Sequence, residues 1–317
     1  MAKVVLTTKV SPTYDDLPEQ QYHFPRTYLR QVEEALNDWC IYYEPRRPTG
    51  DLSSRGGRQS YFATARIRRI EADPAVPNHF YAFVTDYLPF NRPVRFEEDG
   101  FYYESGLQKA DGSTNKGAFG RAVRGIRDQE YDLILQAGFA HILGSEPRNR
   151  PAPDVPEEAP HVPLGLAESP ANWSDEEIAL ADGRPIIEKM IARPFRERAF
   201  SVSVKAAYRD TCAITGIKII NGMGRSEVQA AHIRPVAACG PDSVRNGIAL
   251  SGTMHWMFDR GLVSIDDDYG ILIARDKVPD TVERLIVAER RLLLPEDVRE
   301  RPHRQFLRYH QREVFKG

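Results

Sequence analysis

Residues that can perform hydrolytic chemistry follow one another in the C-terminal half of the chain: His232, Asn246, His255 and Asp259. His255 and Asp259 are four residues apart, so on a helix their side chains project from one face and can share a divalent cation. A carboxylate and an imidazole suit Mg²⁺ or Mn²⁺ better than a metal that selects thiolates. An imidazole with an ordinary pKa of about 6.5 can deprotonate water at physiological pH, and a cation can stabilise the charge that develops on a phosphate.

Local signals place these side chains on short elements. Residues 227–233 are expected to form a strand that ends near the first histidine, and Asn246 falls in a long loop rich in proline and glycine. Ser251 is a suitable N-cap and Gly261 a suitable stop residue. They predict a helix of about two turns over residues 252–260, which carries the second histidine and the aspartate.

The other C-terminal segments predict elements that can support this stretch. We expect a helix over residues 194–208, a strand-like fragment with a turn over 212–216, and a hairpin formed by 262–266 and 271–274. The basic tail, residues 299–316, predicts either a helical arm on DNA or a helix that packs its apolar side chains onto the domain. Both can hold on opposite faces of one helix.

The order strand-histidine, loop-asparagine, helix-histidine resembles that of the HNH nucleases with the ββα-metal fold, over residues 195–276. The surrounding words CAITG, NGIAL and FDRGL strengthen the resemblance. It implies that His232 is the general base, that Asn246 braces the base and its loop, and that His255 and Asp259 bind the metal. It also implies a DNA endonuclease that uses one Mg²⁺ or Mn²⁺ ion and leaves 5′-phosphate and 3′-hydroxyl ends.

One position departs from the family pattern. Many HNH nucleases have a metal-binding aspartate or histidine just before the base, and this chain has Ala231 there. The metal would then depend on His255, Asp259, water and DNA phosphates, or on Gln229, which lies two residues back on the same strand face. A binding protein whose nuclease site has decayed at Ala231 therefore stays open as an alternative.

Charge and cysteine content exclude several classes of protein. A net charge of −2 excludes a globally basic nucleic-acid coat, so any DNA-binding surface must be a local patch, for which Arg234, Arg245 and Arg260 are the candidates. Three scattered cysteines form neither a disulfide framework nor a four-thiolate zinc site. With no apolar stretch long enough to span a bilayer and no signal peptide, we expect a cytoplasmic protein without membrane contact.

Length and proline content predict two domains. The chain has 317 residues, about twice a typical domain. Prolines are dense over residues 146–172, which predicts a semi-rigid linker between domains at 1–145 and 173–317. In the first domain, spacing predicts one amphipathic helix over residues 25–42, strands over 61–70 and 80–87, and a helix over 131–139 that Gly138 could cap.

The N-terminal domain resembles EVE domains of the PUA-like superfamily. The supporting words are YHFP at residues 22–25, YFATARI at 61–67 and GRAVRGIRDQEYDLIL at 120–135. The resemblance implies an α+β fold with a PUA-like β-barrel and flanking helices. It also implies that the domain accepts a base flipped out of double-stranded DNA, and that its fusion to an HNH nuclease is a restriction enzyme directed at 5-methyl- or 5-hydroxymethylcytosine.

Aromatic and acidic side chains are the candidates for such a base pocket: Tyr14, Asp15, Trp39, Tyr42 and Tyr43. Stacking and hydrogen bonds to the base edge would offset the few kcal/mol that flipping costs, and an acidic group can accept from the cytosine amino group. The alternatives are an unselective or sequence-specific HNH nuclease and a non-catalytic nucleic-acid-binding regulator. Cutting both strands requires two active sites, which a homodimer would supply.

Overall fold

The computed structural model describes residues 3–10, 16–49, 51, 53–140, 193–275 and 277–317. The proline-rich segment expected to act as a linker, residues 146–172, lies outside these ranges, as do Tyr14 and Asp15. No helix among the described residues is long and apolar enough to cross a membrane.

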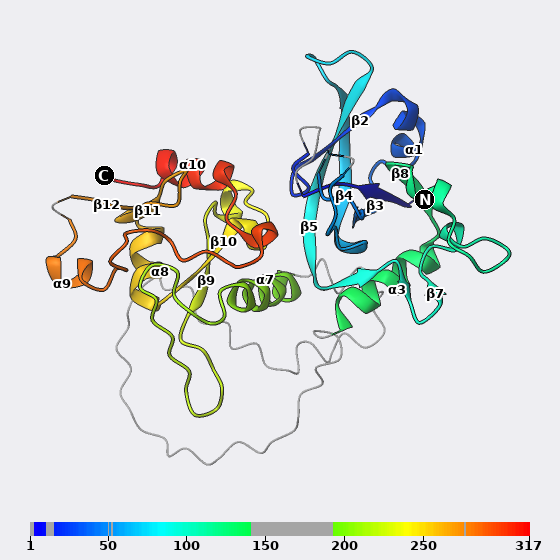
Figure 1. Ribbon diagram of the computed structural model, residues 1–317. Helices are drawn as coiled ribbons and strands as arrows, with labels where there is room; N and C mark the ends of the chain where they lie inside the picture. The colour runs from blue at the N-terminus through cyan, green and yellow to red at the C-terminus, as the bar shows by residue number, and fades with distance from the viewer. Residues whose placement is uncertain (1–2, 11–15, 50, 52, 141–192, 276) are drawn as a thin grey trace.

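A six-stranded mixed sheet, curled into half a barrel, forms the centre of the N-terminal part (Figure 1). Its strand order is β2-β5-β4-β3-β1-β8, and β1 pairs parallel with β3 while the other neighbours are antiparallel. The strands are β1 Lys3–Thr7, β2 Gln21–Pro25, β3 Trp39–Glu44, β4 Ser60–Ala72, β5 His79–Arg95 and β8 Val123–Ile126. The strands expected over residues 61–70 and 80–87 are confirmed as parts of β4 and β5.

Both faces of this sheet are buried. Along β3 the side chains of Trp39, Ile41 and Tyr43 enter one hydrophobic cluster, whereas Cys40 and Tyr42 enter another. The first cluster is covered by α3 (Asp128–Gly138), and the second by α1 (Leu29–Glu34). Smaller elements complete this part: η1 Arg26–Tyr28, β6 Glu97–Glu98, β7 Phe101–Tyr102, η2 Ser105–Leu107 and α2 Lys116–Phe119.

The prediction of a single helix over residues 25–42 is wrong. The helix ends at Glu34, and Asn37 adopts a positive φ of 64° in the turn that leads into β3. Residues 39–44 are all buried, with alternate side chains in the cores on the two sheet faces, and they pair with two neighbouring strands; these contacts outweigh the helical spacing of the apolar residues. A second correction concerns Gly138. It is the last residue of α3, and a side chain there would meet the ring of Phe90, so close packing rather than capping requires glycine.

The C-terminal part contains two antiparallel strands followed by a helix, as expected for a ββα arrangement. These are β9 Gln229–His232, β10 Gly247–Leu250 and α8 Gly252–Asp259, with Ser251 at the N-cap and a positive φ at Gly261. The expected hairpin is confirmed as β11 Val263–Ile265 and β12 Ile271–Ile273. Residues 212–216 form a turn rather than a strand, because the Cys212 amide donates to Ile217 and closes the chain on itself.

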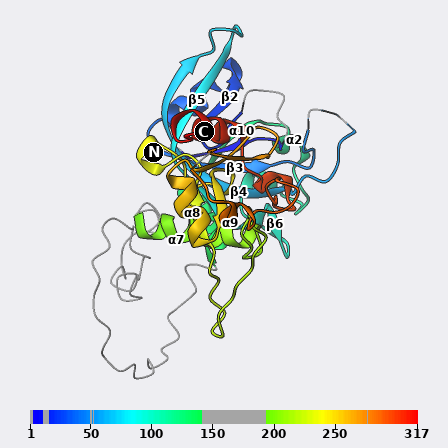
Figure 2. The same cartoon turned by 90° about the vertical axis from the view of Figure 1, so that its left-hand side faces the viewer.

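Helix α7 (Arg193–Ala207) confirms the helix expected over residues 194–208 and packs into both parts of the molecule. Ala199 belongs to the hydrophobic cluster of β3, β5 and α3, whereas Phe200 and Val204 belong to the cluster around β9 and β10. Figure 1 shows α7 between β5 and the C-terminal elements, and Figure 2 gives the view turned by 90°. The two parts of the chain therefore share one helix.

The basic tail packs onto the C-terminal part through α10 (Arg304–Glu313), in which Phe306 and Leu307 are fully buried. Arg304 and Arg308 form ion pairs with Asp268 and Asp267 in the β11–β12 turn. The packing interpretation of the tail is therefore confirmed. The remaining elements of this part are η3 Val236–Ala238, η4 Val244–Asn246, α9 Asp280–Glu283 and η5 Val298–Glu300.

His310 attaches α10 to the end of α8. Its ring stacks on Phe258 with 3.7 Å between centroids, and its nitrogens lie 2.9 Å from Ser264 Oγ and 3.0 Å from the Phe258 carbonyl oxygen. Burial lowers the pKa of His310 to about 4, although the bond to the carbonyl opposes the shift. The folded protein therefore holds this ring neutral at pH values where an unfolded chain would protonate it.

This difference in pKa predicts a loss of stability in mild acid. Below pH 6.5 the His310 ring is protonated in the unfolded chain but stays neutral in the folded chain. The free energy of unfolding should therefore be about 2 kcal/mol lower at pH 5 than at pH 7.5. Urea denaturation of wild type and His310→Gln at both pH values measures the effect. The variant should lose that part of the pH dependence; an unchanged pH dependence would contradict the assignment to His310.

Candidate active site

The candidate site lies where β9, β10 and α8 meet (Figure 1). In the β9–β10 pair His232 is opposite Gly247, and Gln229 is opposite Leu250. The distance along β9 from Gln229 to His232 is roughly 10 Å, because each strand residue rises about 3.3 Å. A hydrogen bond from His255 in the first turn of α8 reaches Gln229 at the start of β9, which places the helix histidine beside the strand that ends at His232.

His232 is held from two sides and is one-fifth exposed. Its ring stacks on Phe200 of α7 with 3.8 Å between centroids and 8° between planes. Its Nε2 lies 3.0 Å from Oδ1 of Asp242, a nearly buried side chain. Because an ionised carboxylate can only accept, Nε2 carries the proton and Nδ1 of a neutral ring keeps its lone pair.

Asp242 is ionised in this setting. Burial by itself raises the pKa of its carboxyl, but the hydrogen bond with His232 and the charge of Arg196 outweigh burial and lower it. Sequence reasoning missed Asp242. It is one aspartate in a loop of glycine, proline and serine, and its spacing from the histidine carries no helical or strand periodicity.

Asn246 is fully buried and binds the backbone of the loop that follows β9. Its Oδ1 accepts from the Arg234 amide at 2.9 Å, and its Nδ2 donates to the carbonyl oxygens of Arg234 and Pro241 at 3.0 and 2.9 Å. The side chain thus closes the loop between residues 234 and 246, the loop that also carries Asp242.

His255 and Asp259 face one another on α8, with 3.5 Å between Nε2 and Oδ2. The other ring nitrogen of His255 lies 2.7 Å from Oε1 of Gln229. Because an amide oxygen accepts, Nδ1 carries the proton and the lone pair of Nε2 points to the side of Asp259. A histidine that donates its second ring N–H to a neighbouring oxygen is the usual arrangement for a metal ligand.

The donor set fits a hard divalent cation held by few protein ligands. Cis ligands of an octahedral ion bound at about 2.1 Å lie about 3 Å apart, close to the separation of the His255 and Asp259 donors. No group of three or more His, Cys, Asp or Glu side chains in the described ranges could hold a metal. Ala231 is buried in the core, and Gln229 bonds the His255 ring. Water and phosphate would complete the shell, as is common for Mg²⁺.

The three candidate DNA-binding arginines differ in what they contact. Arg245 lies 3.3 Å from Glu19 across the two parts of the chain. Arg234 donates to the Ala238 carbonyl oxygen and lies over the Tyr309 ring at 5.0 Å. Arg260 is exposed at the end of α8, where it lies 4.5 Å from the Trp256 ring. Of these three, Arg260 is the most accessible to a phosphate.

A cavity of about 830 Å³ opens at one end of the N-terminal sheet. Four aromatic side chains line it, together with acidic, imidazole and basic groups: Tyr22, Tyr43, Phe96, Phe119, Asp16, His23, Lys9, Arg46, Arg47, Lys116 and Arg121. Of the candidate pocket residues in the described ranges, Tyr43 lines this cavity and is at the same time buried in the core that contains Trp39, whereas Tyr42 is buried in the core on the other sheet face. Sequence reasoning missed Asp16, whose Oδ1 accepts from the His23 amide at 2.8 Å.

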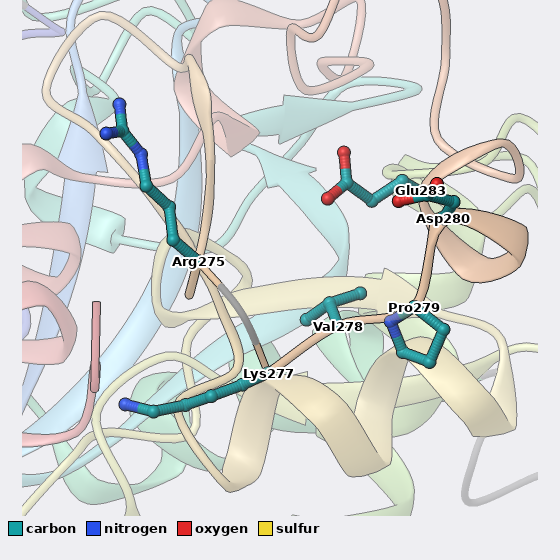
Figure 3. A pocket seen from close by; sticks show the side chains of 6 residues that line it. All are labelled: Arg275, Lys277, Val278, Pro279, Asp280 and Glu283. Carbon is teal, nitrogen blue, oxygen red and sulfur yellow. The ribbon is translucent and has the colours of Figure 1, made fainter.

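A second cavity, of about 420 Å³, lies between β12 and α9. Figure 3 shows the basic side chains of Arg275 and Lys277 on one side of it and the acidic side chains of Asp280 and Glu283 on the other. None of the candidate site residues lines it.

Comparison with known proteins identifies part of the chain. Residues 212–266, which include all four candidate nuclease residues, match a family described as HNH endonuclease. No curated protein sequence matches the chain.

Three solved structures show distant likeness. The modification-dependent TagI restriction endonuclease has 15% identity and a TM-score of 0.30, over 98% of this chain and 81% of the other. The N-terminal domain of Staphylothermus marinus McrB has 12% identity and a TM-score of 0.28, over 42% and 92%. The type IV phosphorothioation-dependent restriction endonuclease ScoMcrA has 14% identity and a TM-score of 0.22, over 97% and 51%. These scores are too low to transfer a fold or a function.

The contacts of Asn246 predict a local effect when its side chain is removed. Asn246→Ala leaves three backbone groups of the loop without their partner, which should cost about 1–3 kcal/mol per buried group left unsatisfied. Hydrogen exchange should show lost protection of the Arg234 amide, because that amide donates to Asn246 alone among the bonds described for it.

Asn221→Ala is the matched control. Asn221 also accepts from backbone amides, those of Met223 and Arg225, but in an exposed turn where water can replace it. It should leave stability and the exchange of Arg234 unchanged. Equal effects of the two substitutions would show that Asn246 does not hold the loop.

Proposed function

We propose that this chain is a metal-dependent DNA endonuclease that the N-terminal domain directs to DNA carrying modified cytosine. The observation that carries the nuclease assignment is the HNH endonuclease match over residues 212–266, together with a histidine whose Nδ1 is available as a base. The proposal for modified cytosine is supported by the aromatic cavity and by the resemblance of the N-terminal domain to EVE domains.

In the proposed reaction His232 takes a proton from water at Nδ1 while Asp242 holds the opposite side of the ring. The water oxygen attacks phosphorus, the bond from phosphorus to the 3′ oxygen breaks, and the 3′ oxygen takes a proton from a second water, which gives 5′-phosphate and 3′-hydroxyl ends. Asn246 keeps the loop around Asp242 closed. General-base catalysis of this kind contributes about 10²- to 10⁴-fold to the rate.

His255 and Asp259 are the residues that would hold one Mg²⁺ or Mn²⁺ ion, with Gln229 fixing the His255 ring. When bound, such an ion stabilises negative charge on the phosphate and on the leaving oxygen. Arg260 would contact a neighbouring phosphate, and Arg234 and Arg245 would support the loop and the domain contact beside it. A homodimer would place two such sites on opposite strands.

The cavity suits a single flipped base. The half-buried Phe96 and Phe119 offer ring faces for stacking, with Tyr43 packed beneath Phe119, and Asp16 offers a carboxylate that can accept from the cytosine amino group. The basic residues around it, such as Arg46 and Lys116, can neutralise flanking phosphates. In this proposal Tyr43 and Asp16 act in the pocket, and Trp39 and Tyr42 support it from the cores.

Cleavage of defined DNA tests the proposal. Plasmids that contain cytosine, 5-methylcytosine or 5-hydroxymethylcytosine are incubated with the protein and Mg²⁺, Mn²⁺ or EDTA, and the products are resolved on gels. We expect metal-dependent cutting of modified DNA only. His232→Ala should reduce cutting by at least about 100-fold and preserve DNA binding, because it removes the base alone. Equal cutting of all plasmids would indicate an unselective nuclease, and binding without cutting a regulator.

The pocket is tested separately with Phe119→Ala. Loss of one stacking ring should weaken binding to modified DNA by about 10-fold or more and leave binding to plain DNA unchanged. The matched control is Phe101→Ala, which removes an exposed aromatic ring outside the cavity. If Phe119→Ala keeps the preference for modified DNA, this cavity is not the base pocket.

A further inference from the structure

Helix α7 presents two side chains to the candidate base. Arg196 and Phe200 are four residues apart and therefore lie on one face of the helix, one turn from each other. Phe200 stacks on the face of the His232 ring. Arg196 binds the carboxylate of Asp242, which in turn is hydrogen-bonded to Nε2 of that ring. The position of the imidazole thus depends on α7 through both of its contacts.

Arg196 connects two carboxylates from different parts of the chain. Its Nε and Nη2 lie 2.8 and 2.7 Å from Oδ2 of Asp242, and its Nη1 lies 3.3 Å from Oδ1 of Asp86. Asp242 uses its other oxygen for His232. A continuous series of charged contacts therefore runs from Asp86 on β5 through Arg196 and Asp242 to His232.

Asp86 occupies a bulge that directs it out of the sheet. The pairing of β4 with β5 shifts between Thr64, opposite Leu88, and Arg66, opposite Thr85, so β5 has one residue more than β4 there. Asp86 has a positive φ of 53°, which is uncommon for a residue other than glycine and typical of a position that its surroundings determine. Bulges commonly re-aim a side chain beside a functional site.

The second carboxylate oxygen of Asp86 is held within the sheet. It accepts from Thr85 Oγ1 at 2.9 Å and lies 3.8 Å from Arg68 on β4. The side chain is about one-quarter exposed, as is that of Arg196, so each pair contact is partly desolvated. A second contact joins β5 and α7 further along both elements: the Asn91 side chain donates to the Ser203 hydroxyl at 3.0 Å.

The strand that carries Asp86 adjoins two segments that line the aromatic cavity, although no residue of β5 itself lines it. β5 pairs with β2, which contributes Tyr22 and His23 to the cavity, and Phe96 follows directly after the end of β5. A ligand that displaced β2 or Phe96 would therefore act on a direct neighbour of the strand that positions Asp86.

We propose that Asp242 is a positioning residue for the base and that Asp86, through Arg196, makes the position of His232 depend on the N-terminal domain. This inference rests on the proposed nuclease function and names a route by which the N-terminal domain regulates that site. An ionised Asp242 keeps the proton on Nε2 of His232 and so leaves Nδ1 for the water. The guanidinium fork of Arg196 reaches both carboxylates at once, which a lysine ammonium cannot reproduce.

Asp242→Asn tests the first step. The amide is close in size to the carboxylate but can donate to Nε2, which would place the ring proton on Nδ1 and block the base. Single-turnover cleavage should slow by about 100-fold or more with DNA affinity unchanged, and ¹⁵N spectra of the His232 ring should show the Nδ1–H tautomer. Asp242→Glu, which keeps the carboxylate, should recover part of the rate.

Asp86→Asn tests the connection between the domains, with Glu44→Gln as the matched control. Glu44 also pairs across the two parts of the chain, with Arg299 at 2.7 and 2.9 Å, but has no described contact with Arg196 or Asp242. Asp86→Asn should slow single-turnover cleavage by about 3- to 30-fold and shift the ¹⁵N signals of His232. Glu44→Gln should change neither, although both substitutions remove one charge between the domains.

The outcomes separate this inference from the proposed function. Failure of the wild-type protein to cut any DNA would overturn the nuclease proposal, whereas the His232 spectra still report on the connection. Equal rates and spectra for Asp86→Asn and Glu44→Gln would overturn the connection to the N-terminal domain. A normal rate and an unchanged His232 tautomer in Asp242→Asn would overturn the positioning role.

Discussion

The structure depends on one shared helix. Helix α7 contributes Ala199 to the core of the N-terminal sheet and Phe200 and Val204 to the core around β9 and β10, so neither core is complete without it. Gly247 lets β10 approach α7 closely, since a Cβ there would lie 2.4 Å from a methyl carbon of Val204. Burial on both sides of one helix fixes the candidate base against the sheet of the other domain.

The packing against α7 stabilises the small unit formed by β9, β10 and α8. Two short strands and a two-turn helix bury little apolar surface alone, and they are supported by α7 on one side and α10 on the other. Polar contacts across the two parts add to this packing, in particular Glu19 with Ser243 and Arg245. Because Glu19 is buried, loss of its partners would leave a buried charge unpaired and destabilise the fold.

The sequence was informative where the relevant forces are local. The start signal at Ser251, the stop at Gly261 and the spacing of His255 and Asp259 predict α8 and its two donors, because these signals act within one or two turns; the Ser251 hydroxyl itself makes no cap hydrogen bond, and the Gly252 amide donates to Glu227 instead. Asp242, Arg196 and Asp86 could not be predicted, because their partners are brought together only by the packing of α7 on β5. For the same reason the prediction of helix for residues 39–42 is wrong, since the strand partners of this segment are distant in sequence.

The central claim is that one imidazole and one cation-binding pair act on opposite sides of the same phosphodiester bond. The most direct measurement is anomalous diffraction from crystals of His232→Ala bound to a modified DNA duplex and Mn²⁺, in which cleavage is blocked. The account predicts a manganese peak in contact with His255 Nε2, Asp259 and a phosphate oxygen, with the substituted position 232 on the opposite side of that phosphorus. Manganese elsewhere, or a phosphate bound away from β9, would contradict it.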